Sequence, residues 1–276
     1  MVREAGLDTV RLPVKWSAHS EAGAPYTIDG SFFDHVDRAV GCALRRDLGV
    51  VLDIHHFDEL STDADGQAAR FLALWSQISE HYAGASERLW FELLNEPHPP
   101  MTPERWNRLL ADALAVVRAS NPERAVIVGP VRWNIPDALP MLRPPDDERL
   151  IVTVHYYAPF QFTHQGADWL EEAGDWRGTS WGTDAERERV RADLKRAAAW
   201  ARDRGRPLFL GEFGTIENAD PPLASRGRRS CAQRPNGSAS AGPTGTSPPT
   251  SELSTSAGTP GVRRSGTPCS ADYQRW

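Results

Sequence analysis

Cysteine is scarce in this chain, with three residues among 276 and no C-x-x-C pair. This spacing excludes a disulfide-stapled scaffold and a zinc ribbon. Long apolar runs are also missing, because none approaches the roughly 18 residues that span a bilayer. We therefore expect no membrane partner. No basic-then-apolar segment begins the chain, so no signal peptide is visible and the localisation stays undetermined.

A basic excess is absent as well. Lys and Arg number 31 against 37 Asp and Glu, which gives a formal net charge of −6. Nucleic-acid binders normally carry a basic excess, so we expect no nucleic-acid partner. Apolar residues make up 40% of the chain, and ten residues are Trp. This content is enough for a sizeable core, and the length suits one large domain or two small ones.

The last 56 residues, 221–276, differ from the rest. Of these, 31 are Ser, Thr, Pro or Gly, and the segment contains one Val and two Leu but no Ile, Phe or Met. Such a composition buries too little apolar surface to offset the entropy of ordering the chain. The sequence therefore predicts a folded body at 1–220 and a disordered tail at 221–276.

Short apolar runs alternate with longer amphipathic stretches in the body. The first pattern predicts strands, and apolar residues at helical spacing predict helices. Thr102 is a typical helix cap, and Pro103 suits the first helical position. We expect strands at 7–12, 50–54, 89–94, 125–128, 150–154 and 207–210, and helices at 31–46, 67–82, 102–120, near 136–142 and 184–204.

This alternation predicts parallel strands buried on both faces, in an open doubly wound sheet or in a (β/α)8 TIM barrel. No G-x-G-x-x-G or P-loop follows a strand, which disfavours the open sheet. Polar residues follow successive strands instead, which is the arrangement of a barrel active site. They are Arg11, His55, His56, Asn95, Glu96, Arg132, Trp133, His155, Tyr156, Tyr157 and Glu212.

Glu96 and Glu212 are the candidate catalytic pair. They follow apolar strands in LWFELLNEPHPP and PLFLGEFGT, and each alone is as readily an ordinary solvated acid. Together they fit a retaining glycosidase, in which one carboxyl protonates the leaving oxygen and the other attacks the anomeric carbon. We expect the carboxyls about 5–5.5 Å apart, the retaining distance. The glycines beside Glu212 are expected to let the backbone approach a ligand closely.

The histidines are candidates for hydrogen bonding rather than for metal binding. Adjacent strand residues face opposite sides, so His55 and His56 would chelate one ion poorly, and no H-E-x-x-H is present. We therefore predict no metal and no cofactor, with both histidines bonded to sugar hydroxyls or to a carboxylate. His155 and Tyr157 are two apart and share a face. Tyr157 could donate to the nucleophile and keep it ionised, or the two could form a buried, satisfied pair.

Arg11 and the loop tryptophans each have two readings. Arg11, buried at a strand end, either anchors a carboxylate or touches substrate. Four tryptophans fall in predicted loops, where the indole either stacks on a sugar ring or packs the loop: Trp133, Trp169, Trp176 and Trp181.

With these residues in place, the body resembles glycoside hydrolase family 5, the cellulase-type retaining β-glycanases of the (β/α)8 clan. The resemblance lies in AGLDTVRLPVKW, VVLDIHHFDEL, LWFELLNEPH, VTVHYYAPFQFTHQGADW and PLFLGEFGT, in family order over most of residues 1–218. It implies Glu96 as acid/base and Glu212 as nucleophile. It also implies a shell of substrate-binding residues: Arg11, His55, Asn95, His155 and Tyr157, with His164 and Trp169 lining the glycone side.

The chain departs from the family pattern at both ends. Family members have a strand before the helix that ends in REAGLDTVRLP, and Met1 falls inside that helix. The tail at 221–276 takes the place of an eighth strand with a stacking Trp. We therefore expect an incomplete barrel that lacks its first and last strands. We interpret the tail from about Pro221 as a frameshift product, with a genuine Ser/Thr/Pro/Gly linker as the alternative.

The expected function is cleavage of internal β-1,4 links of glucans in polysaccharide catabolism. The expected partner is a β-linked oligo- or polysaccharide, bound by a monomer. A β-mannanase or another β-glucanase on the same scaffold, an inactive carbohydrate-binding remnant and a zinc hydrolase are the alternatives.

Overall fold

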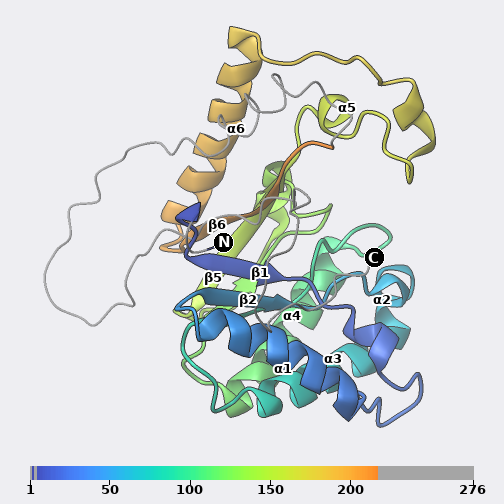
Figure 1. Ribbon diagram of the computed structural model, residues 1–276, viewed down its shortest axis with the longest axis vertical. Helices are drawn as coiled ribbons and strands as arrows, with labels where there is room; N and C mark the ends of the chain where they lie inside the picture. Colours follow the sequence, from blue (N-terminus) through green and yellow to red (C-terminus); the bar gives the residue numbers. More distant parts are fainter. Residues whose placement is uncertain (1, 3–4, 217–276) are drawn as a thin grey trace, which may run out of the picture.

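The computed structural model describes residues 2 and 5–216, which form one curved parallel sheet with helices on its outer side (Figure 1). The predicted tail lies outside the described residues. The sheet has six strands paired in chain order, each parallel to its neighbour. The strands are β1 (Thr9–Leu12), β2 (Gly49–Asp53), β3 (Leu89–Glu92), β4 (Val126–Val128), β5 (Leu150–Tyr156) and β6 (Leu208–Phe213).

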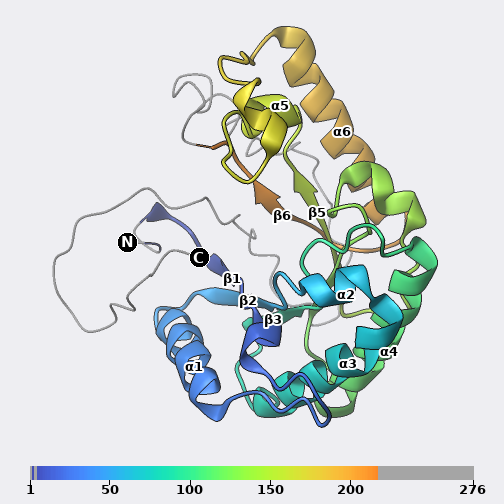
Figure 2. The same ribbon diagram turned by 90° about the vertical axis from the view of Figure 1, so that its right-hand side faces the viewer.

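Amphipathic helices connect these strands and cover the outer face of the sheet. In Figure 2 they follow the sheet as an arc, which is open between β6 and β1. The predicted helix near 136–142 is a 3-10 helix, and Pro140 inside it lacks the N–H donor that an α-helix would use. The helices are η2 (Trp16–His19), α1 (Gly30–Leu44), α2 (Asp58–Thr62), α3 (Ala64–His81), α4 (Pro103–Ser120), η3 (Pro136–Met141), α5 (Phe160–Thr163), η4 (Glu171–Gly174) and α6 (Asp184–Arg202).

Local sequence sets where the long helices begin. The Thr102 side chain accepts a hydrogen bond from the Arg105 N–H at the start of α4, as its position predicted. Thr183 and Glu186 form a reciprocal capping box at the start of α6. None of the helices among the described residues is long and apolar enough to cross a membrane.

The sheet separates two apolar cores. The larger core lies between the strands and the helices, and it includes Leu52, Trp75 and Phe91. A smaller cluster fills the concave side. It consists of Val51, Ile127 and Phe209, with Trp90 and Ile151 packed against them. The inner strands are thus buried on both faces, as expected for parallel strands, whereas the edge strands β1 and β6 are partly exposed.

Over the described residues, six parallel strands form a nearly closed barrel with alternating helices, which confirms the predicted (β/α) barrel fold class. Among the described residues, no strand pairing joins β6 back to β1. A side-chain contact spans this opening instead: Arg11 Nη1 of β1 lies 2.7 Å from Glu212 Oε1 of β6. We call this opening the seam.

Candidate active site

Arg11 is the centre of the site. Its guanidinium donates to both oxygens of Glu92, at 2.6 and 3.0 Å, and to Glu212 Oε1 at 2.7 Å. Nη2 also lies 2.8 Å from Asn95 Oδ1 and 2.7 Å from Asp53 Oδ2. Burial lowers the pKa of Arg11, but its carboxylates outweigh this and raise the pKa well above its ordinary value. Arg11 therefore stays charged and anchors carboxylates, the first of its two predicted readings.

Glu212 is held in its ionised form. Tyr157 Oη donates to Glu212 Oε2 at 3.0 Å, as the sequence predicted, while Arg11 binds the other oxygen. Burial raises the pKa of Glu212, but His155, Arg11 and His55 together with the Tyr157 hydrogen bond outweigh it and leave the pKa below its usual value. Burial, followed by the Glu212 charge, raises the pKa of Tyr157, so its hydroxyl remains a donor.

Glu96 lies in the loop after β3 with a φ of +47°, in the left-handed region. Its Oε1 is 2.7 Å from His155 Nδ1. On the other side of the imidazole, Asn134 Nδ2 is 3.5 Å from Nε2. The main-chain N–H of His155 also donates to the main-chain carbonyl of Asn134 at 2.9 Å. His155 is thus fixed from both sides, and Glu96 is aimed at the same place as Glu212.

An irregularity in strand pairing places Glu212 beside His155. Val154 pairs with Leu210, but His155 pairs with Glu212, so Gly211 is an extra residue in β6. A regular register would turn Glu212 to the outer face beside Tyr156. A Cβ at Gly211 would lie 2.8 Å from His155 Nε2, so this glycine makes room for the imidazole. Gly211 therefore has a packing role in the site.

The two adjacent histidines correct a prediction. They follow β2 rather than lying in it, and His56 has a φ of +52°. Their rings meet edge to face at 4.3 Å rather than facing opposite sides. His55 Nδ1 lies 2.9 Å from Asp53 Oδ2, which confirms the predicted bond to a carboxylate. Burial lowers the pKa of His55, but Asp53 outweighs it and raises the pKa.

Of the remaining predicted residues, His164 and Trp169 connect to the site through Tyr157. His164 packs edge-on against Tyr157 at 5.1 Å and against Trp169 at 6.4 Å, and Trp169 is 67% exposed. Trp133 is half exposed and stacks on His98. Trp181 is buried, so its loop-packing reading holds. The structure thus connects all ten predicted site residues through direct contacts or one shared neighbour.

Three residues of the site were not predicted. Asp53 and Glu92 end β2 and β3 and face the concave side, fully buried. The available sequence signal was an acidic residue at the end of an otherwise apolar strand, as in VVLD and LWFE. Asn134, also fully buried, closes a run of three left-handed residues, Arg132 to Asn134. No sequence pattern identifies its contact with His155.

Glu96, His155 and Glu212 also form the group of described residues that could offer ligands to a metal ion. One ligand atom from each lies within 4.8 Å of the others. In this structure Glu96 bonds to His155, and Glu212 accepts hydrogen bonds from Tyr157 and Arg11. The arrangement is that of paired carboxylates with hydrogen-bond donors.

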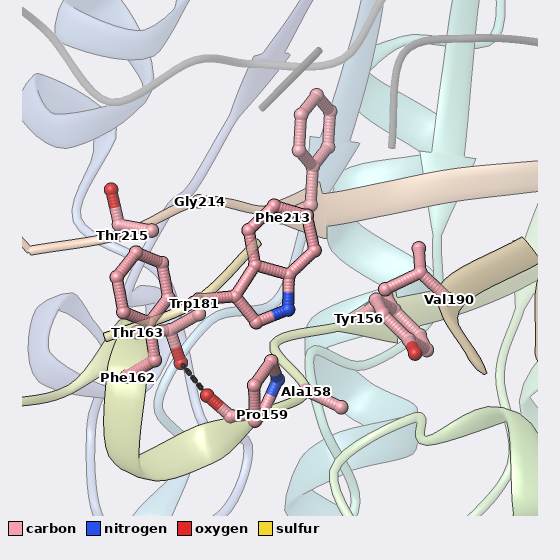
Figure 3. A pocket seen from close by; sticks show the side chains of 10 residues that line it. All are labelled: Tyr156, Ala158, Pro159, Phe162, Thr163, Trp181, Val190, Phe213, Gly214 and Thr215. Carbon is pink, nitrogen blue, oxygen red and sulfur yellow. Dashed lines mark hydrogen bonds between the residues drawn. The ribbon is translucent and has the colours of Figure 1, made fainter. Parts of the chain in front are cut away.

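An apolar pocket lies at the ends of β5 and β6, and Figure 3 shows the side chains that line it. Tyr156 and Phe213, which line it, alternate along their strands with His155 and Glu212. Its volume of about 20 Å³ holds about one water molecule, which is too small for a sugar ring. Phe162, Trp181 and Val190 complete its apolar wall.

A parallel barrel with two glutamates, an arginine and histidines at the carboxyl ends of its strands has the architecture of a barrel glycoside hydrolase. Comparison with known proteins agrees. The family model described as Cellulase (glycosyl hydrolase family 5) matches residues 1–234. The chain therefore belongs to glycosyl hydrolase family 5.

Individual relatives are endoglucanases. Endoglucanase H of Acetivibrio thermocellus is 36% identical over 218 residues, which cover 79% of this chain and 23% of that protein. Endoglucanase C of the same organism is 30% identical over 255 residues, which cover 79% of this chain and 74% of that protein. The solved endoglucanase Cel5A of Thermotoga maritima is 42% identical with a TM-score of 0.80, over 82% of this chain and 73% of that one. The chain thus spans less than a quarter of the first relative's length.

Proposed function

We propose that this protein is a retaining endo-β-1,4-glucanase of polysaccharide catabolism. The observation that carries the proposal is the pair of facing glutamates, with an oxygen of each within 4.8 Å of the other. Carboxyls about 5–5.5 Å apart suit a double displacement, whereas an inverting enzyme needs about 6.5–9.5 Å to admit a water. The endoglucanase relatives support glucan as the substrate.

Glu212 attacks the anomeric carbon, because Arg11 and Tyr157 keep it ionised. Glu96, bonded to His155, protonates the leaving oxygen and then activates the water that releases the glycosyl intermediate. With its oxygen held by Arg11, Asn95 has its amide nitrogen available for the sugar hydroxyl beside the anomeric carbon. His55, His56, His164 and Trp169 supply the surrounding sugar contacts.

The test uses the full chain on soluble β-glucan and on an aryl β-cellobioside. Glu212→Ala and Glu96→Ala should each lower kcat at least about 10³-fold. Azide should rescue Glu212→Ala with the inverted glycosyl azide, and Glu96→Ala with the retained one. Glu188→Ala, on the exposed face of α6, is the control and should match the parent. Activity surviving in both variants would reassign the roles.

Two further arms address the alternatives. Dialysis against EDTA should leave the rate unchanged, and a loss restored by Zn²⁺ would favour a zinc hydrolase. Cel5A of Thermotoga maritima has been solved with cellobiose and with mannotriose, which supports mannan as a second substrate. Comparing kcat/KM on glucan and mannan decides between the two substrates, and binding without turnover would indicate a carbohydrate-binding remnant.

A further inference from the structure

Buried charge lies directly beneath the paired glutamates. The side chains of Arg11, Asp53 and Glu92 are 2%, 0% and 0% exposed. The next layer down the barrel interior is the apolar cluster that contains Val51 and Trp90. Burying carboxylates is costly, and a single guanidinium needs only one of them for neutrality. Asp53 also bonds to His55, whereas Glu92 contacts no basic group other than Arg11 among the described residues, so its presence calls for an explanation.

Glu92 occupies one whole edge of the Arg11 guanidinium. Its two oxygens accept from Nε and Nη2, which is the bidentate geometry. The Nη1 group then points across the seam to Glu212. Together with Asp53 and Asn95, which hold Nη2, this anchor from β3 sets where the donor for β6 lies.

Glu92 also shares the charge of Arg11. Three carboxylates, Asp53, Glu92 and Glu212, contact the same guanidinium. Each negative group offsets part of the positive field that the other two experience. Without Glu92, the field of Arg11 would act more fully on Glu212. A carboxylate bound more tightly is a weaker base and a poorer nucleophile.

We propose that Glu92 is a positioning residue that acts through Arg11, aiming its Nη1 at Glu212 and limiting how strongly it holds that carboxylate. This inference rests on the proposed function for its purpose, since a nucleophile must be ionised and still reactive. Glu92 itself touches neither substrate nor the reacting atoms.

The other charged or titratable groups around Glu212 are not mutated in the Glu92 variants. They are Arg11 from β1, Asp53 and His55 at the end of β2, Glu96 after β3, and His155 and Tyr157 at the end of β5.

The experiment titrates Glu212 itself in the full chain. Glutamate side chains are labelled with ¹³C at the carboxyl, and the Glu212 resonance is assigned by its loss in Glu212→Gln. In Glu92→Gln, the titration midpoint of Glu212 should fall by about one pH unit. Glu92→Asp draws the carboxylate back by one methylene, so the midpoint should fall by less. The Glu212 midpoint should therefore decrease from the parent to Glu92→Asp to Glu92→Gln. If Glu92→Gln does not fold, the midpoint of Glu92→Asp alone decides the test.

Asp147→Asn is the matched control. Asp147 binds Arg118 through two hydrogen bonds, at 2.7 and 3.1 Å, away from the site. Its loss should leave the Glu212 midpoint at the parent value. An unchanged or higher midpoint in the Glu92 variants would overturn the inference, because a merely supporting residue would loosen Arg11 and weaken its hold on Glu212. The titration needs no turnover. If the chain were inactive, the proposed function would be refuted, and the Glu212 midpoints would still decide this inference.

Discussion

Single residues in this site act as parts of one charged network. His55 is an example, since its ring is largely buried and bonded to Asp53, which in turn binds Arg11. The carboxylate stabilises the protonated ring more than burial destabilises it, so its pKa rises. The same contacts lower the pKa of Asp53, although burial by itself would raise it. A proton on His55 is therefore linked to the stability of the fold.

This linkage gives a pH-dependent stability. A raised pKa in the folded state means that the contribution of His55 is present below its ordinary value, about 6.5, and is lost as pH rises through the raised value. His55→Gln should therefore destabilise the protein more at pH 6 than at pH 9. Urea unfolding at the two pH values measures this difference. An equal loss at both would show that His55 contributes no linked proton.

At the scale of elements, the extra residue in β6 is what assembles the site. The strand would otherwise present Glu212 to the outer face, next to Tyr156. Gly211 permits the irregularity because its missing Cβ leaves room for Thr153 Oγ1 and His155 Nε2. Bulges beside active sites commonly re-aim a side chain in this way.

Gly211→Ala should therefore damage activity more than stability. Its Cβ would approach the imidazole to 2.8 Å and Thr153 Oγ1 to 2.6 Å, which forces His155 away from Glu96. A displacement of this size should lower kcat/KM on glucan about 10²-fold. Gly214→Ala is the control, because a Cβ there meets no atom within 4 Å. Equal activity in both variants would show that His155 does not depend on this glycine.

For the whole molecule, the seam is the weakest part of the described sheet. The strands β3 and β4 are paired on both sides, whereas β1 and β6 each have one partner among the described residues. The ion pair between Arg11 and Glu212 joins the two edges without a backbone ladder. An edge strand exposes backbone groups that a central strand keeps bonded.

Hydrogen exchange should reveal this gradient. Amides in 89–92 and 126–128 should exchange slowest, and those in 9–12 and 208–213 should exchange faster, because local opening costs less at an edge. Mass spectrometry on peptides from these four strands measures the order. Protection of 9–12 and 208–213 equal to that of the central strands would mean that the seam is closed in solution.

The sequence by itself determined the alternating elements, the parallel sheet and the two glutamates, because these follow from local periodicity and from acids that end apolar runs. Most strand and helix bounds were predicted within a few residues. Two of the differences are informative: β3 ends at Glu92 rather than at Leu94, and β6 continues through Glu212 to Phe213.

Only the tertiary structure decided how these residues meet. Pairing register depends on both strands, so the shift between Val154 and His155 is invisible in either strand alone. The contact of Arg11 with Glu212 spans 201 positions and arises from the curvature of the whole sheet. The same curvature brings Asp53 and Glu92 onto one guanidinium. Local sequence specifies which side chains of a strand face the core and which face the barrel interior. The curvature of the sheet decides which charged side chains meet in that interior.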